Sequence, residues 1–217
     1  MKAAIRRVAL GLVFAFRPWS REMRRIVREL RTIVVPTLSI NLVNALIEGE
    51  DHRFRMHAGV DLWAVARALL NTFWVGRRQG ASTIQQQLVR VATGRYEITL
   101  RRKIREMALG VALGSYFSQD EILALYLVKG YYGYEMAGLF RGCERLCISP
   151  EMAGPAEAAS LVARLKYPEP RVNSLTQRDR INRRTQHILA RMTRAGCHGL
   201  IVGRSREREL LRIAPGT

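Results

Sequence analysis

Two glutamates of this chain, Glu50 and Glu106, lie in segments that could carry out chemistry at a sugar carbon. Glu50 belongs to residues 48–59, where an acid pair, two histidines and an aromatic residue stand between two apolar helical patterns. Glu106 ends a run of arginine and lysine. Two carboxylates on separate rigid helices can act as a base toward the attacking oxygen and as a group serving the leaving side. Such an arrangement is typical of inverting transfer at a sugar, whereas residues 48–59 taken alone favour an acidic helix end followed by a solvated loop.

The basic residues before Glu106 could stabilise a phosphate leaving group. Fixed cations stabilise the charge that develops on such a group, and the run supplies Arg101, Arg102, Lys103 and Arg105. Lys103 and Glu106 are three residues apart, so both can point into one cleft. The alternative is a solvated helix face with a local ion pair worth well under ~1 kcal/mol. At this point both interpretations stay open.

A polar cluster at a helix start could hold hydroxyl or amide groups of a ligand. It consists of Ser82, Thr83, Gln86 and Gln87. The alternative is an N-cap followed by exposed glutamines. His57, in the first segment, is more often a hydrogen-bonded structural residue than a base or a metal ligand.

The composition indicates a globular protein with an anionic partner. The 217 residues are 48% hydrophobic, which is ample for a core, so the composition is that of a globular protein and not of a disordered one. Lys and Arg total 36 and Asp and Glu total 18, giving a formal charge of +18. Such a balance suits nucleic acid, an anionic membrane surface or a phosphorylated substrate.

The three cysteines, Cys143, Cys147 and Cys197, are too few and too irregularly spaced for a disulfide framework. Cys197 lies beside His198, but no further ligand with zinc-site spacing is evident. We therefore expect buried, inert thiols and no metal site.

The periodicity of apolar residues predicts a mainly α fold in a single domain, and no run shows sustained strand alternation. Capping residues predict several helix starts: Ser82–Thr83, Thr99, and a capping box at residues 118–121. A loop is expected at residues 166–170, which contain two prolines. Glycine-bounded connectors are expected at residues 76–80 and 131–142. The predicted helices cover residues 38–48, 60–74, 84–91, 100–111, 122–127, 155–165 and 176–195.

The amino terminus carries an apolar run, residues 8–16, behind Lys2, Arg6 and Arg7. The run is far shorter than the ~20 residues of a membrane-spanning helix. With Trp19 and the arginines near it, the segment suits the interface of a membrane.

The order of these motifs resembles the peptidoglycan glycosyltransferases, glycosyltransferase family 51. This family comprises the transglycosylase module of class A penicillin-binding proteins and its monofunctional relatives. The similarity runs from about residue 38 to about residue 192. It rests on four motifs in order: Glu50-Asp51-x-x-Phe54-x-x-His57-x-Gly59, Gly80-x-Ser82-Thr83-Ile84-x-Gln86-Gln87, Arg102-Lys103-x-x-Glu106, and Ile122-Leu123-x-x-Tyr126-Leu127.

The resemblance implies a lysozyme-like, mainly α fold and the polymerisation of lipid II into glycan strands, with release of undecaprenyl pyrophosphate. By position, Glu50 matches the family's general base, and Glu106 matches the glutamate on the pyrophosphate or donor side. Arg102 and Lys103 match residues that hold the pyrophosphate. The matching residues of the donor site and of the rest of the first motif are Ser82, Thr83, Gln86, Gln87, Asp51, Phe54, His57 and Gly59.

The resemblance also implies a location and partners. We expect a monofunctional enzyme on the periplasmic face of the bacterial inner membrane, peripherally or weakly anchored, meeting lipid II, the nascent glycan strand and other cell-wall synthesis proteins. No cofactor is required, although Mg²⁺ or Mn²⁺ at the pyrophosphate is compatible with the chemistry. The expected divisions are an N-terminal segment, residues 1–35, a glycosyltransferase domain, residues 36–196, and a basic tail, residues 197–217.

The chain departs from the family pattern in three places. Gln85 stands where threonine is usual, and Ala124 and Val128 stand where glutamate and asparagine are usual. The glycine-rich fifth motif looks shortened around residues 133–138. These changes leave an alternative open: a lipid II- or glycan-binding relative with weak or no polymerase activity. A third hypothesis, nucleic-acid binding by residues 101–105 and 178–184, lacks a recognition motif or interleaved aromatic residues, so no nucleic-acid partner is expected.

Overall fold

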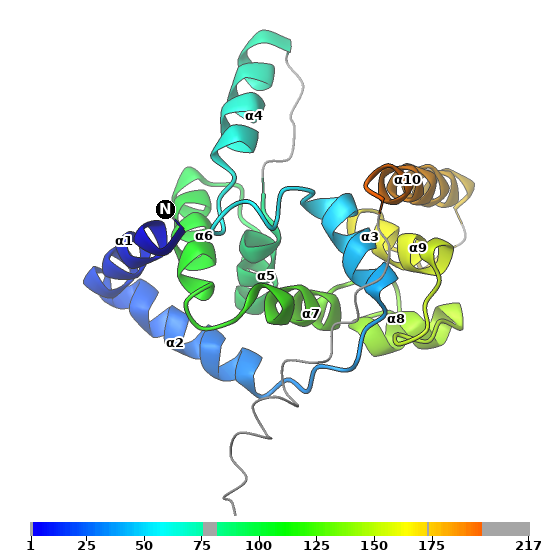
Figure 1. The fold of residues 1–217 in the computed structure, drawn as a ribbon, viewed down its shortest axis with the longest axis horizontal. Coiled ribbons are helices and arrows are strands. Elements are labelled where there is room, and N and C mark those ends of the chain that lie inside the picture. The colour runs from blue at the N-terminus through cyan, green and yellow to red at the C-terminus, as the bar shows by residue number, and fades with distance from the viewer. Residues whose placement is uncertain (1, 76–81, 173, 197–217) are drawn as a thin grey trace, which may run out of the picture. The chain divides into compact units, whose positions relative to one another are not determined.

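The computed structural model describes residues 2–75, 82–172 and 174–196, and these form ten helices (Figure 1). Extended pairing among them is limited to two isolated bridges, Tyr131 with Ala137 and Gly133 with Glu169. The predicted mainly α fold is therefore confirmed. The helices are α1 (Lys2–Ala15), α2 (Arg17–Arg31), α3 (Ile40–Glu50), α4 (Leu62–Val75), α5 (Ile84–Thr93), α6 (Leu100–Leu113), α7 (Gln119–Lys129), α8 (Leu139–Leu146), α9 (Pro155–Lys166) and α10 (Leu175–Arg194).

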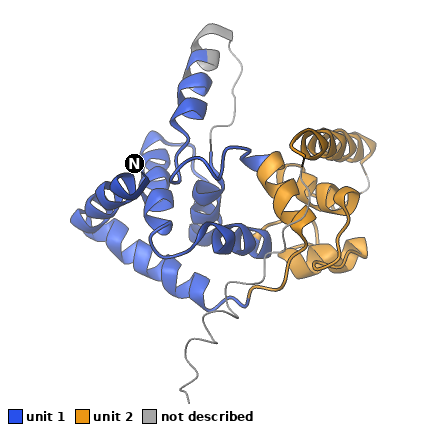
Figure 2. Ribbon diagram, in the orientation of Figure 1, with its two compact units in different colours: residues 1–34, 50–129 blue, residues 35–49, 130–217 orange. Residues whose placement is uncertain are grey.

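The helices divide into two compact units (Figure 2). Unit 1 comprises residues 1–34 and 50–129, and unit 2 comprises residues 35–49 and 130–217. The chain thus leaves unit 1 after α2, contributes most of α3 to unit 2, and returns to unit 1 at Glu50.

Unit 1 is built around α5, which packs against α6 and α7, while α2 covers α5 and α6. Its core includes Leu88, Leu109, Leu113 and Leu123, all fully buried. Residues 122–127 of α7 are buried on every side, as expected for a helix without a polar face. Lys129 at the end of α7 forms an ion pair with Glu29 of α2, with 2.5 Å between Nζ and Oε1.

The predicted caps of unit 1 are confirmed, and they fix where α5, α6 and α7 begin. Thr83 and Thr99 accept hydrogen bonds from the third residue beyond them, which identifies them as N-caps of α5 and α6. Ser118 and Glu121 form the expected capping box, each side chain accepting from the other's backbone N–H.

The amino-terminal helices belong to unit 1. Helix α2 buries Met23, Ile26 and Leu30 in the core. Helix α1 packs on α6 through Ala9 and Val13 and leaves Val8 and Leu12 more than half exposed. Across the described residues, no helix combines the length and apolar character needed to cross a membrane.

Unit 2 contains α8, α9 and α10, with α10 packed along α9. Gly49 allows α3 close to these helices, because a Cβ there would lie 3.0 Å from Val162 and 3.2 Å from Ile188. Helix α8 was not expected, because residues 131–142 were predicted to be a connector. The connector comprises only residues 131–138, and α8 begins at Leu139.

The cysteines follow the prediction only in part. Cys143 is buried, and burial raises the pKa of its thiol to about 11. The prediction was wrong for Cys147, which is exposed because it follows the end of α8 in a left-handed conformation. Cys197, the turn at residues 76–80 and the tail at 197–217 lie outside the described residues.

Candidate active site

Glu50 is the last residue of α3 and lies half-buried at the start of the second stretch of unit 1. Gln87 of α5 donates a hydrogen bond from Nε2 to Glu50 Oε2 at 3.1 Å. Tyr126 of α7 donates from its hydroxyl to Gln87 Oε1 at 2.7 Å. Because the tyrosine hydroxyl donates to the amide oxygen, the amide nitrogen faces Glu50. Two helices of unit 1 therefore fix a hydrogen-bond donor on this carboxylate.

The tyrosine of this chain of hydrogen bonds is held in its protonated form. Burial raises the pKa of Tyr126 well above its ordinary value, and the negative charge of Glu50 raises it further. The Tyr126 hydroxyl is therefore a permanent donor, so Gln87 keeps one orientation.

Glu106 lies inside unit 1, where its side chain is fully buried and held by two arginines. Arg90 donates from Nε and Nη2 to the two carboxylate oxygens, each at 3.0 Å. Arg102, one turn before Glu106 on α6, donates to Oε1 as well. Such charge-assisted, bidentate pairing fixes the position of the carboxylate. The bond to Glu106 raises the pKa of Arg90 in turn.

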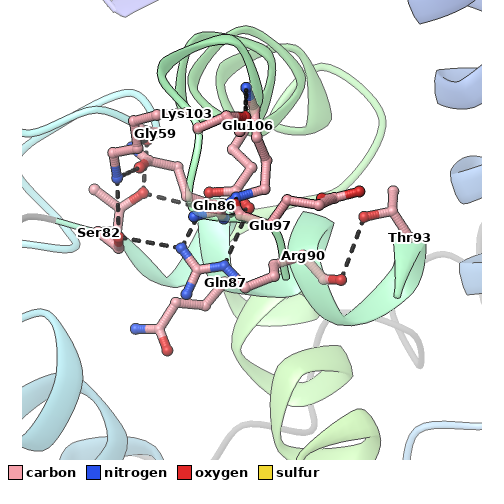
Figure 3. A network of polar contacts seen from close by, with 12 residues as sticks. Gly59, Ser82, Gln86, Gln87, Arg90, Thr93, Glu97, Lys103 and Glu106 are labelled. Atoms are coloured by element: carbon pink, nitrogen blue, oxygen red, sulfur yellow. Dashed lines mark hydrogen bonds and ion pairs between the residues drawn. The ribbon is translucent and has the colours of Figure 1, made fainter. Parts of the chain in front are cut away.

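Lys103 and Ser82 extend this group. Lys103 Nζ donates to Ser82 Oγ at 2.9 Å and to Gln86 Oε1 at 2.7 Å, and Arg90 Nη2 lies 3.4 Å from the same Ser82 oxygen. Figure 3 shows Ser82, before the start of α5, together with the converging side chains of α5 and α6. Burial lowers the pKa of Lys103, and the charges of Arg90 and Arg102 lower it further, against the opposing effect of Glu106. We call Ser82, Arg90, Arg102, Lys103 and Glu106 the cationic cluster.

The residues of the first motif hold the loop after α3 onto the start of α5. Gly59 N–H donates to His57 Nδ1 at 3.1 Å, so the proton of a neutral His57 lies on Nε2, which contacts Asp51 at 3.0 Å. Asp51 also accepts from the backbone N–H of Ile84 at 3.2 Å. Thr83 Oγ1 donates to the Gly59 carbonyl at 2.7 Å. These bonds position the loop that follows Glu50 relative to the cluster.

Gly59 and Phe54 complete that support. Gly59 has a φ of +121°, and a Cβ would meet the Gly110 carbonyl and the Val111 Cα at 2.9 Å, so only glycine fits. Phe54 is fully buried, with its ring edge-on to His57. Gln86 joins both groups, since its Nε2 donates to the Gly59 carbonyl at 3.1 Å.

The structure thus brings the predicted residues together in two roles. Glu50, Gln87 and the cationic cluster are the candidates for contact with a ligand, with Glu106 fully buried behind Arg90 and Arg102. The residues that hold the loop are buried against one another. These residues are Asp51, Phe54, His57, Gly59 and Thr83. Gly80 of the second motif lies outside the described residues.

Sequence reasoning missed Arg90 and the role of Tyr126 as a positioning residue. Arg90 follows Gln86 and Gln87 at helical spacing, so an analysis of that face of α5 could have found it. The four basic residues before Glu106 also divide. Arg102 and Lys103 belong to the cluster, whereas Arg101 and Arg105 lie outside it and, together with Arg102, line a groove described below.

The positions that depart from the family pattern are mostly buried. Ala124 is 2% exposed within α7, and Gln85 is 3% exposed with no hydrogen-bond partner for Oε1 among the described residues. Val128 is half-buried. In unit 2, residues 133–138 are held by the backbone N–H of Tyr134, which donates to the Glu169 carbonyl at 2.8 Å.

Comparison with known proteins identifies the family. The family model described as Transglycosylase matches residues 20–193. The chain is similar to penicillin-binding protein 1A of Rickettsia felis, with 33% identity over 173 residues, covering 76% of this chain and 22% of that protein. It is 36% identical to the Neisseria lactamica protein of the same name over 154 residues (70% and 19%). It is 35% identical to the Escherichia coli K12 protein over 156 residues (71% and 18%).

The match therefore spans about a fifth of the length of these relatives. It includes the segment with Glu50, the cationic cluster and both units of the fold. From the extent of the family match, the chain belongs to the transglycosylase family, the peptidoglycan glycosyltransferases of glycosyltransferase family 51.

Proposed function

We propose that this chain polymerises lipid II into glycan strands by inverting transfer, with release of undecaprenyl pyrophosphate. The observation that carries the proposal is the pairing, along α5, of a positioned carboxylate with a cationic cluster. Gln87 contacts Glu50, and one turn further along the helix Arg90 contacts Glu106. A base and a phosphate-binding group that are both held by side chains of one rigid helix match a reaction in which a sugar hydroxyl displaces a pyrophosphate.

In this mechanism Glu50 acts as the general base. Its carboxylate accepts the proton of the acceptor's 4-hydroxyl, the oxygen attacks C1 of the donor sugar, and the bond from C1 to the pyrophosphate oxygen breaks. The Gln87 amide, fixed by Tyr126, holds the carboxylate in one orientation. A positioned general base contributes typically ~10²–10⁴-fold to the rate.

The cationic cluster is suited to the leaving pyrophosphate. Arg90, Arg102 and Lys103 supply positive charge, while the buried Glu106 keeps the two arginines in place. We assign Glu106 to this positioning of cations. Within the described parts of the chain, no group of three or more His, Cys, Asp or Glu residues could hold a metal ion. A Mg²⁺ or Mn²⁺ ion at the pyrophosphate is compatible with the proposed reaction.

The same proposal includes contact with a membrane, where a lipid-linked substrate resides. Leu62, Trp63 and Leu70 on α4 are each at least 60% exposed, an unusual feature for large apolar residues of one helix. We propose that this face meets the bilayer on the periplasmic side of the inner membrane, beside the nascent glycan strand and other cell-wall synthesis proteins.

The test is glycan formation from labelled lipid II in detergent. The parent chain is compared with Glu50→Gln and with the control Glu48→Gln, which makes the same chemical change two residues away, where Glu48 pairs with Arg191. We expect polymer from the parent and the control and none from Glu50→Gln. Lipid II binding without polymer from any of the three would instead support a binding relative, the alternative suggested by the apolar, buried Ala124.

A further inference from the structure

A groove of about 680 Å³ lies in unit 1, lined by α2, the segment before α6 and the first turns of α6. Its wall contains two glutamates, Glu22 and Glu97. It also contains six arginines: Arg21, Arg25, Arg95, Arg101, Arg102 and Arg105. The excess of positive charge suits an anion. Among these residues only Arg102 belongs to the cationic cluster, so the groove is a second basic site.

Arg105 lies buried at the floor of this groove. Its side chain is 7% exposed, and its Nη1 lies 3.4 Å from Glu22. Its Nε and Nη2 atoms have no hydrogen-bond partner among the described residues. Glu22 also pairs with Arg95, at 3.8 Å, so one carboxylate is shared between two guanidinium groups. A buried guanidinium with two unsatisfied nitrogens is costly unless an anion helps to neutralise it.

The amino-terminal end of α6 adds to the attraction for an anion. Thr99, the N-cap of α6, lines the groove, and the first turn of the helix contains no acidic residue. Backbone N–H groups at a helix start carry partial positive charge and commonly bind phosphate. Arg21 of α2 and Arg101 of α6 also line the groove, and their side chains make no hydrogen bond or ion pair to any described residue.

Apolar side chains surround the same basic residues. Pro18 and Trp19 line the groove, and the Trp19 ring lies 5.2 Å from that of Phe16. Ile98 and Leu100, which flank Thr99, are 89% and 77% exposed. Arginines combined with exposed aliphatic and aromatic residues are typical of a surface in the headgroup layer of a membrane. A nucleic acid would need several stacking rings, and Trp19 is the one aromatic residue among the described residues that line the groove.

We propose that this groove binds the phosphodiester headgroup of an anionic phospholipid. This inference rests on the proposed function, because it assumes that the chain contacts a membrane. The lipid meant is a phospholipid of the bilayer and not the substrate lipid II. Its headgroup site would act in addition to the exposed apolar face of α4. Residues of α2 and α6 would thereby fix unit 1 on an anionic surface.

The test uses flotation of the whole chain with vesicles that contain no lipid II. Vesicles of phosphatidylcholine alone are compared with vesicles containing phosphatidylglycerol. The groove variant is Arg21→Gln/Arg101→Gln, and the control Arg178→Gln/Arg180→Gln removes two exposed arginines of α10. We expect the groove variant to bind phosphatidylglycerol vesicles about 25-fold more weakly than the parent, roughly fivefold for each arginine. The control should bind within about threefold of the parent.

An equal loss in the control pair would overturn the proposal, because bulk charge would then explain the binding. Parent binding that does not increase with phosphatidylglycerol would overturn it too. If the vesicles do not bind, but inorganic phosphate at low millimolar concentration or a duplex oligonucleotide binds to the groove, the groove belongs to another ligand and the proposal is overturned. The variant Arg21→Lys/Arg101→Lys should regain most of the vesicle binding, which excludes misfolding. Polymer formation in detergent by the glutamine variant should match the parent, so this test fails or succeeds separately from the proposed reaction.

Discussion

The ion pair between Arg90 and Glu106 should stabilise unit 1 measurably, and Arg90→Met tests this. The Glu106 side chain is fully buried, and Arg90 supplies two of its hydrogen bonds at 3.0 Å. Removal of one partner of a buried ion pair typically destabilises a protein by ~3–5 kcal/mol. Two features reduce the effect here: Arg102 still contacts Glu106, and the Arg90 side chain is 26% exposed. We expect Arg90→Met to lower the free energy of unfolding by about 2 kcal/mol, roughly half the usual value.

A double-mutant cycle separates this interaction from the other effects of each substitution. Glu106→Gln keeps the shape of the side chain and removes its charge. The double variant should be destabilised less than the sum of the single variants, with a coupling energy of about 1.5 kcal/mol. Arg90→Lys should lie between the parent and Arg90→Met, because it keeps the charge but loses the bidentate geometry.

Urea unfolding followed by tryptophan fluorescence is the appropriate assay. The three tryptophans of the chain, Trp19, Trp63 and Trp74, all lie in the residues of unit 1. The signal therefore reports on the unit that contains the ion pair. Additive effects, with a coupling energy below about 0.3 kcal/mol, would refute the reasoning, since sites that do not interact add within that range.

Two further perturbations test the surroundings of Glu50. Tyr126→Phe removes the donor to Gln87 and should lower turnover while destabilising unit 1 by about 1 kcal/mol. The pKa of Tyr126 is raised above its ordinary value of 10.0, so the unfolded chain loses this proton first and the parent loses stability as the pH rises above that value. The free energy of unfolding, measured below and above that pH, should decline less for Tyr126→Phe than for the parent. An identical decline in both would contradict the raised pKa of Tyr126. Gly59→Ala places a Cβ 2.9 Å from the Gly110 carbonyl at a φ of +121°, and should lower the free energy of unfolding by about 3 kcal/mol; a change below about 1 kcal/mol would count against the close packing.

Local features of the chain were predictable from the sequence. Thr83, Thr99 and the capping box at residues 118–121 depend only on residues within one turn, so side-chain type and spacing indicate them. The helical periodicity of α3, α5, α6 and α10 is local for the same reason. The motif order predicted Glu50, Glu106 and the polar cluster at the start of α5 as candidate site residues, since it depends on residue types and spacing alone.

Features that depend on contacts between distant residues were not predictable. The Arg90–Glu106 pair joins two helices across sixteen residues, and Tyr126 reaches Gln87 across thirty-nine. The division of the basic run of α6 between the cluster and the groove depends on how α2 and α5 pack against it. Cys147 was wrongly predicted to be buried. It ends α8 in a left-handed conformation, and the pattern of apolar residues does not indicate where that helix ends.

The role of Glu50 as general base is tested by the effect of Glu50→Gln on turnover and on lipid II binding, both determined on the same preparation. If Glu50 is the base, the first-order rate of glycan transfer should fall by at least ~100-fold, while the dissociation constant for lipid II stays within about threefold, because glutamine keeps the side chain's shape. A proportionate loss of binding and turnover, or turnover within about threefold of the parent, would contradict the role of Glu50 as general base.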